Sequence, residues 1–186
     1  MDTVLNKKEG NLLAARIAKD AGVTLSKCYQ CGKCTAGCPM ADSYDLMPRQ
    51  IVHYMQFGEM TRILKSKTIW LCASCHTCTE RCPNEINVSG LIEGARIEAN
   101  RLGICAVKEV KLFNDIFMNN VKEFGKSQEV ILEGLYNVKS GHLTQDMANV
   151  PKMLSKKIVR AELNQTDAKH EVKEIINKSE EGGIPL

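Results

Sequence analysis

Residues 28–39 read CYQCGKCTAGCP, and residues 72–83 read CASCHTCTERCP. Each stretch places four cysteines in the spacing C-x2-C-x2-C-x3-C, and a proline follows the last of them. Together the two stretches use all but one of the nine cysteines in the chain; the exception is Cys105. Closely spaced thiolates are ligands for iron–sulfur clusters and soft metals, so the doubled pattern indicates cluster or metal chemistry.

The spacing matches the ligand run of bacterial-type proteins that hold two [4Fe–4S] clusters. In those proteins the first three cysteines of a run bind one cluster, and the fourth binds the other. Pro39 and Pro83 have no N–H and are expected to end the short helical turn that closes each run. The sequence therefore predicts two clusters with crossed ligands: Cys28, Cys31, Cys34 and Cys82 on the first, and Cys72, Cys75, Cys78 and Cys38 on the second.

Zinc and disulfide bonds are the alternative uses of these cysteines. Paired C-x2-C units also bind zinc, but zinc needs only two cysteines from each run and leaves the rest of the pattern unexplained. Disulfide frameworks belong to oxidising compartments, and residues 1–9 lack the apolar core of a secretory signal. We therefore expect iron–sulfur clusters in a cytoplasmic protein. Cys105 is expected to be a small buried apolar residue at the start of a helix.

Length and charge narrow the possible functions. The 186 residues suffice for one domain or for a core with extensions. The formal net charge is +3, and two oxidised clusters, each of charge about −2 with its thiolates, bring it to about −1. This balance indicates no nucleic-acid partner. Apolar runs such as 69–73 are far too short to span a membrane, so we also expect no direct membrane insertion.

Helical patterns run along the whole chain, and the segment 39–71 between the two runs shows no strand-like alternation. Pro48 suits a helix start, Asn87 suits a helix cap, and glycines stop several segments. The expected helices are 11–21, 48–56, 59–65, 87–102, 110–124, 128–139, 145–156 and 167–178.

This pattern predicts an all-α protein with the α-helical ferredoxin fold around two [4Fe–4S] clusters. We expect a helical N-terminal extension over 1–27, a cluster module over 28–104 and a helical C-terminal extension over 105–186 that serves as a docking surface. Within the last part, Phe113 and Phe117 belong to an apolar stripe. A solvated face is expected opposite the stripe, formed by Lys108, Lys111 and Lys122.

Three segments resemble the C subunit of the heterodisulfide reductase of methanogenic archaea: 28–39, 70–83 and 146–154, the last reading DMANVPKML. The resemblance covers about residues 12–160. It implies an iron–sulfur subunit that relays electrons from a flavin-containing, iron–sulfur A subunit to the B subunit, which reduces the CoM-S-S-CoB heterodisulfide in methanogenesis. It also implies association with a hydrogenase or a formate dehydrogenase.

The residues favour a relay role independently of this resemblance. The chain contains neither G-x-G-x-x-G nor G-x-x-x-x-G-K-[ST], the fingerprints of dinucleotide and nucleotide sites. All expected cluster ligands are cysteines, which leaves no open coordination position for a substrate. We therefore expect a non-catalytic subunit of an oxidoreductase complex, with no catalytic residues and no substrate site.

Two alternatives stay open. One is the iron–sulfur subunit of a fumarate reductase, succinate dehydrogenase or glycerol-3-phosphate dehydrogenase type of complex. Such subunits typically add a [2Fe–2S] domain or Cys-Cys-Gly repeats, which this chain lacks. The other is a free-standing ferredoxin-like carrier, against which residues 105–186 count, because cluster housing does not need them.

Four residues in and beside the runs invite a functional interpretation. Lys33, His76 and Arg81 would place positive charge beside the cluster sulfurs and so tune the potential. A solvated or hydrogen-bonded role is the commoner outcome for a histidine such as His76. Trp70 is expected to be a packing residue next to the second run.

Overall fold

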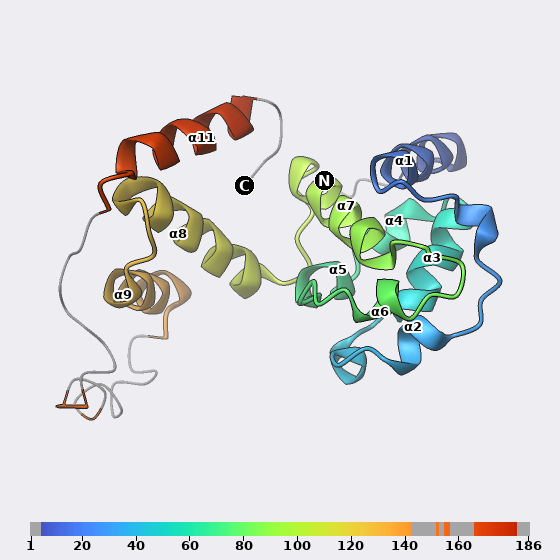
Figure 1. Cartoon of the computed structure of the whole chain (residues 1–186), viewed down its shortest axis with the longest axis horizontal. Coiled ribbons are helices and arrows are strands. Elements are labelled where there is room, and N and C mark those ends of the chain that lie inside the picture. Colours follow the sequence, from blue (N-terminus) through green and yellow to red (C-terminus); the bar gives the residue numbers. More distant parts are fainter. Residues whose placement is uncertain (1–4, 143–151, 153–154, 157–165, 182–186) are drawn as a thin grey trace. The chain divides into compact units, whose positions relative to one another are not determined.

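The computed structural model describes residues 5–142, 152, 155–156 and 166–181, and every regular element among them is a helix (Figure 1). The all-α prediction is therefore confirmed for these residues, including the helical spacer 39–71. The expected helix 145–156 lies largely outside the described residues. The chain divides into two compact units, Met1–Val107 and Lys108–Leu186, each of which is described here by itself.

The first unit holds both cysteine runs among short and medium helices. Two single 3-10 turns, Leu25–Lys27 and Ala41–Ser43, flank the first run. The helices are α1 (Lys7–Asp20), α2 (Lys33–Ala36), α3 (Pro48–Gln56), α4 (Met60–Leu64), α5 (Thr68–Leu71), α6 (Thr77–Glu80) and α7 (Val88–Arg101). The predicted start at Pro48 is confirmed, and so is the cap at Asn87, whose Oδ1 accepts a 2.9 Å hydrogen bond from the Gly90 N–H.

The first helix begins earlier than the sequence pattern predicts. Asn6 Oδ1 accepts from the Glu9 N–H at 3.0 Å, and Glu9 Oε2 accepts from the Asn6 N–H at 2.9 Å. This reciprocal capping box starts α1 at Lys7. The prediction of a start at residue 11 was wrong because residues 7–10 carry no large apolar side chain to extend the periodicity.

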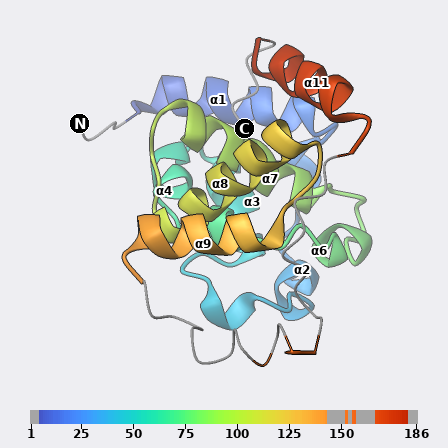
Figure 2. The ribbon, with the colours of Figure 1, turned by 90° about the vertical axis from the view of Figure 1, so that its left-hand side faces the viewer.

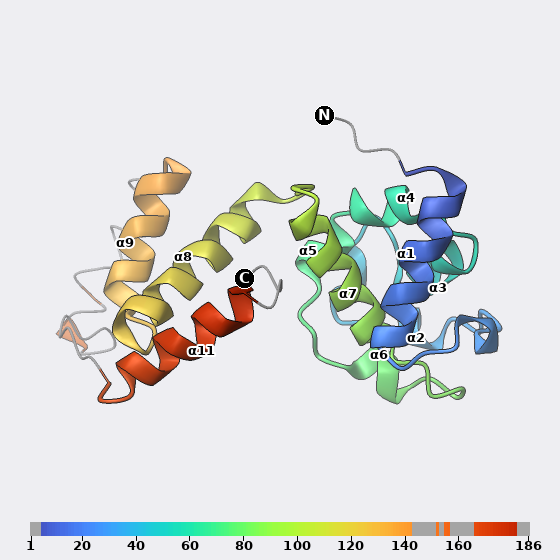
Figure 3. The same cartoon turned by 90° about the horizontal axis from the view of Figure 1, so that it is seen from above.

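Six helices share the core of the first unit: α1, α3, α4, α5, α6 and α7 (Figure 3). Their fully or nearly fully buried side chains include Ala14, Ile17, Ile51, Val52, Met55, Met60, Ile63, Leu64, Ile69, Leu91, Ile92 and Ala95. Cys78 belongs to this core, and Cys28, Cys34, Cys72 and Cys82 pack against it. The core therefore forms a frame on which both cysteine runs are held.

Close backbone packing joins α1 to the turn after α3. Gly10 on α1 lies so near this turn that a Cβ built on it would stand 2.0 Å from the carbonyl oxygen of Gly58. Gly58 itself has a φ of +70°, which favours glycine. Only a residue without a side chain allows the two segments to approach this closely.

Polar contacts add two further ties within the first unit. Asp45 accepts hydrogen bonds from Ser66 Oγ at 2.5 Å, the Lys67 N–H at 3.0 Å and the Thr68 N–H at 3.1 Å. Burial alone would raise the pKa of Asp45, but these bonds outweigh it and lower the pKa to about 2. The ionised carboxylate thus fixes the start of α5, the helix that leads into the second cysteine run.

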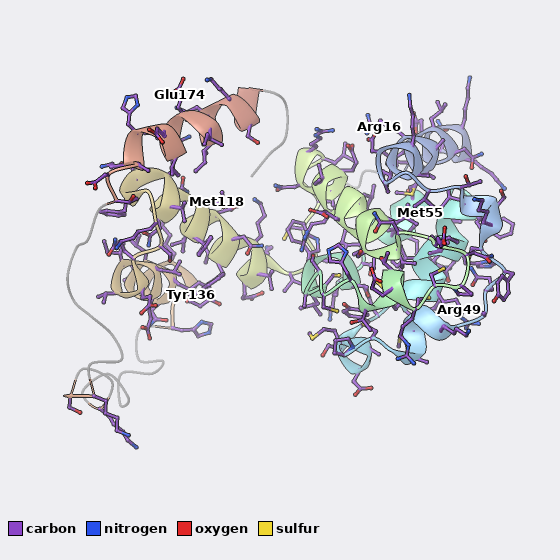
Figure 4. All side chains as sticks on the ribbon, in the orientation of Figure 1. Arg16, Arg49, Met55, Met118, Tyr136 and Glu174 are labelled. Atoms are coloured by element: carbon purple, nitrogen blue, oxygen red, sulfur yellow. The ribbon has the colours of Figure 1, made fainter. Side chains whose placement is uncertain are left out.

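The second polar tie joins α1 to α7. Glu98 is 8% exposed and pairs with Arg16 at 2.6 Å and with Arg101 at 2.7 Å (Arg16 is labelled in Figure 4). A carboxylate this deeply buried requires such partners, because a buried unpaired charge is costly. The two arginines therefore let α7 keep an ionised residue against the core.

The described helices of the second unit are α8 (Lys108–Phe124), α9 (Glu129–Ser140) and α11 (Lys169–Glu181), and α8 contacts both of the others (Figures 1 and 3). Asn120 joins α8 to α9: its Nδ2 donates to the Gln128 carbonyl at 2.9 Å, and its Oδ1 accepts from the Gln128 N–H at 3.0 Å. Both residues are buried. Paired in this way, the side-chain amide closes the turn between the two helices.

The expected apolar stripe of α8 is only partly covered. Ile116 and Asn120 are the buried residues of this helix, whereas Phe113 is 42% exposed and Phe117 is 36% exposed.

Cys105 is half-buried and lies in the segment between α7 and α8, so its expected place at a helix start was wrong. None of the described helices combines the length and the apolar character that crossing a membrane requires.

Candidate iron–sulfur cluster site

The two cysteine loops share one unusual backbone conformation. Gln30 and Gly32 are left-handed in the first loop, with φ of 63° and 82°, and Ser74 and His76 are left-handed at the equivalent positions of the second, with φ of 50° and 59°. A left-handed non-glycine residue costs free energy, so its recurrence indicates a constraint. Turns that include left-handed residues direct successive backbone N–H groups to one concave side, which binds anions and iron–sulfur clusters. The backbone therefore fits an anionic cluster in each loop.

A short helix carries the third cysteine of each run. These helices, α2 and α6, occupy equivalent positions and contact each other. The fourth cysteine follows in the same way in both: the Cys38 N–H donates to the Thr35 carbonyl at 3.1 Å, and the Cys82 N–H donates to the Thr79 carbonyl at 3.0 Å. The structure thus builds two copies of one loop and places them side by side.

Cysteines from the two runs lie near one another. Burial raises the pKa of the Cys78 thiol, and the neighbouring charges of Cys72 and Cys34 raise it further, to about 11. Burial also raises the pKa of Cys34. These thiols are therefore protonated at neutral pH in the free chain, and binding of iron would displace their protons.

Two tyrosines, Tyr29 and Tyr44, each lie near one cysteine of the first run and one cysteine of the second run. The pKa of Tyr29 is raised by loss of solvent, then by a hydrogen bond and charge at Cys31 and by charge at Cys82. The pKa of Tyr44 is raised by burial, then by the charges of Cys72 and Cys38 and hydrogen bonds to them. In the crossed assignment, Cys31 and Cys82 belong to the first cluster, whereas Cys72 and Cys38 belong to the second. The assignment itself stays a prediction.

No three Cys, His, Asp or Glu side chains of the described residues converge as a single metal ion would require. A four-iron cubane makes a different demand, since each of its cysteines binds a different iron.

Polar side chains contact individual cysteines. Gln30 Nε2 donates to Cys28 Sγ at 3.2 Å, and Thr77 Oγ1 lies 3.4 Å from Cys75 Sγ. The contact with Thr77 lowers the pKa of Cys75. A side chain that donates to a thiolate, as Gln30 does, stabilises it, and hydrogen bonds to cluster sulfurs set reduction potentials. The two loops differ here: an amide contacts the first cysteine of one run, and a hydroxyl contacts the second cysteine of the other.

Equivalent threonines anchor the loops to the helices that follow them. Thr35 Oγ1 accepts from the Arg49 N–H in the first turn of α3, and Thr79 Oγ1 accepts from the Ser89 N–H in the first turn of α7, both at 3.2 Å. Arg49 is labelled in Figure 4. The sequence interpretation missed both threonines. The available signal was that threonine recurs one residue after the third cysteine of each run.

The network around Thr79 includes His76. Ser89 Oγ lies 2.9 Å from His76 Nδ1 and 2.8 Å from Thr79 Oγ1. His76 itself is exposed. Its imidazole therefore contributes to fixing the second loop against α7, which agrees with the hydrogen-bonded role expected for it.

Arg81 and Trp70 also lie at the loops. A Cβ built on Gly37, the residue before Cys38, would stand 2.4 Å from Arg81 Nη1, so the Arg81 side chain of the second run covers the backbone of the first.

Trp70 is 4% exposed within the core, as expected for a packing residue. Its Nε1–H is buried and has no hydrogen-bond partner among the described residues.

Comparison with known protein families finds a match over the part of the chain that holds these loops. Residues 24–86 match the 4Fe-4S dicluster domain. This confirms the iron–sulfur character predicted from the cysteine runs, and the word dicluster agrees with two clusters.

Curated relatives extend the similarity beyond the loops. The chain is 32% identical over 102 residues to the C subunit of the H(2):CoB-CoM heterodisulfide,ferredoxin reductase of Methanothermobacter marburgensis, covering 53% of this chain and 55% of the relative. It is 30% identical over 114 residues to the iron-sulfur C subunit of the CoB--CoM heterodisulfide reductase of Methanopyrus kandleri, covering 56% and 59%. It is 34% identical over 89 residues to the C subunit of the Ferredoxin:CoB-CoM heterodisulfide reductase of Methanosarcina mazei, covering 48% of this chain and 52% of the relative. The predicted resemblance to these C subunits is confirmed, and the chain spans about half the length of the relatives it matches.

Proposed function

We propose that this chain is an electron-transfer subunit of a heterodisulfide reductase complex. It relays electrons through two [4Fe–4S] clusters from a flavin-containing A subunit to a B subunit that reduces the CoM-S-S-CoB heterodisulfide. The observation that carries the proposal is the pair of equivalent cysteine loops in contact through α2 and α6. The similarity to the C subunits of such reductases supports the choice of complex.

The proposed ligands follow the crossed assignment. Cys28, Cys31, Cys34 and Cys82 hold the first cluster, and Cys72, Cys75, Cys78 and Cys38 hold the second. When bound, each cluster supplies a site that accepts and releases one electron. The left-handed turns of both loops would offer backbone N–H groups to the negative charge of the clusters. The core beneath Cys78 and the buried Trp70 exclude water from one side.

The same arrangement favours conduction over catalysis. All the proposed ligands are cysteines, so neither cluster offers an open position to a substrate. Gln30 and Thr77 each contact a cysteine sulfur. They are thus placed to adjust a potential. The disulfide chemistry then belongs to the B subunit, and the non-catalytic role is part of this proposal.

A complex purified anaerobically from the native source tests this function. We expect a flavoprotein and a heterodisulfide-cleaving protein to co-purify with the chain. Its reduced clusters should be reoxidised by the heterodisulfide within the complex, whereas the isolated reduced chain, as the control, should not react. Isolation of the chain alone, or direct reoxidation of the isolated chain by the heterodisulfide, would contradict the relay.

A further inference from the structure

Helix α9 is apolar but has no buried residue. Half of the Glu129–Ser140 sequence is large and apolar: Val130, Ile131, Leu132, Leu135, Tyr136 and Val138. Val130 is 44% exposed, Leu135 is 42% exposed and Val138 is 65% exposed. A helix that is apolar around most of its circumference is normally enclosed on most sides. Among the described residues of the second unit, α8 is the helix that contacts α9 most (Figure 2 shows α9 along its length).

A groove runs between α8 and α9, with a volume of about 420 Å³. Its apolar lining comes from Val110 and Phe113 of α8 and from Leu132 and Tyr136 of α9. The rings of Phe113 and Tyr136 meet edge to face with their centroids 5.8 Å apart (Tyr136 is labelled in Figure 4). The exposed Phe113, which the sequence pattern placed in an apolar stripe, is therefore part of a concave apolar surface.

The charge of this groove is of one sign. Glu109, Glu129 and Glu133 line it, and none of the other described residues that line it is a lysine, an arginine or a histidine. Among the residues that the structure describes, none of the three glutamates is in a salt bridge. An apolar floor beside unpaired carboxylates complements a segment that combines apolar and basic side chains.

We propose that the groove between α8 and α9 binds a basic amphipathic segment of a partner protein. The apolar side chains of that segment lie against Leu132 and Tyr136, and its lysines or arginines meet Glu109, Glu129 and Glu133. The proposal uses only residues of the second unit and goes beyond the electron relay, so it holds or fails independently of cluster content.

Photo-crosslinking in the native complex identifies the occupant. Tyr136 is replaced by p-benzoylphenylalanine in the full chain, the complex is irradiated under anaerobic conditions, and the crosslinked peptide is sequenced by mass spectrometry. We expect a segment of another protein in which lysines or arginines flank apolar residues. A crosslink to a second copy of this chain, to an acidic segment or to nothing would overturn the proposal.

A charge reversal at Glu133 tests whether the glutamates of the groove attract a basic segment. The probe is a synthetic amphipathic peptide of leucine and lysine, and its counterpart carries glutamate in place of lysine. Glu133→Lys in the cluster-loaded chain is expected to weaken binding of the lysine peptide about tenfold. The matched control is Glu171→Lys on α11, an exposed glutamate outside the groove, which should leave binding unchanged.

Unchanged circular dichroism and iron content in both variants separate a binding defect from misfolding. Equal weakening by the two substitutions, or equal binding of the two peptides, would show that the groove does not select basic segments.

Discussion

Replacing Cys38 by alanine is expected to remove the cluster whose other ligands are Cys72, Cys75 and Cys78, although Cys38 belongs to the other run. Iron content should fall from about eight to about four atoms per chain, because a [4Fe–4S] cluster depends on its four thiolates. The structure supports this choice through Tyr44, which neighbours both Cys38 and Cys72. Iron analysis together with electron paramagnetic resonance of the reduced protein makes the measurement, and Cys28→Ala and Cys72→Ala serve as references for the loss of each cluster's signal.

Cys105→Ala provides the matched control. Cys105 is half-buried outside both runs and should be dispensable for cluster binding. Its replacement is expected to leave the iron content and both signals unchanged. The crossed assignment is wrong if Cys38→Ala instead abolishes the signal of the cluster held by Cys28, Cys31 and Cys34.

Gly10→Ala is expected to destabilise the first unit by about 3 kcal/mol, at the upper end of the usual cost of overpacking. A Cβ at this position would stand 2.0 Å from the Gly58 carbonyl oxygen, and both groups belong to backbone that cannot rotate away. Helix α1 would have to move off the turn after α3. Anaerobic thermal unfolding, followed by loss of the visible absorbance of the clusters, reports this change in the unit that holds them.

Gly134→Ala is the corresponding control on α9. A Cβ at Gly134 would have nothing within 4 Å, so the substitution adds only helix propensity. It should stabilise that helix by about 1 kcal/mol. Similar destabilisation by the two substitutions would show that the close approach of Gly10 and Gly58 does not limit stability.

Local sequence signals predicted much of the first unit. Pro48 and Asn87 begin helices because a proline needs no N–H partner in the first turn and an asparagine side chain supplies one. The cysteine runs likewise carry their chemistry in their spacing alone. Such features depend on residues that are close together in the chain, which is why they are readable from the sequence.

The remaining features depend on residues far apart in the chain. Asp45 has a role only because Ser66 and Thr68 fold back onto it, and Thr35 only because Arg49 lies beside it. Periodicity placed Phe113 on one face of a helix but did not reveal that little covers this face. Tertiary structure decides which apolar faces are enclosed and which remain available to a partner.

The presence of two [4Fe–4S] clusters in the two cysteine loops is tested most directly by metal and sulfide analysis. Protein prepared anaerobically and reconstituted to saturation is expected to contain about eight irons and about eight acid-labile sulfides per chain. Zinc without sulfide, or about four irons at saturation, would contradict it.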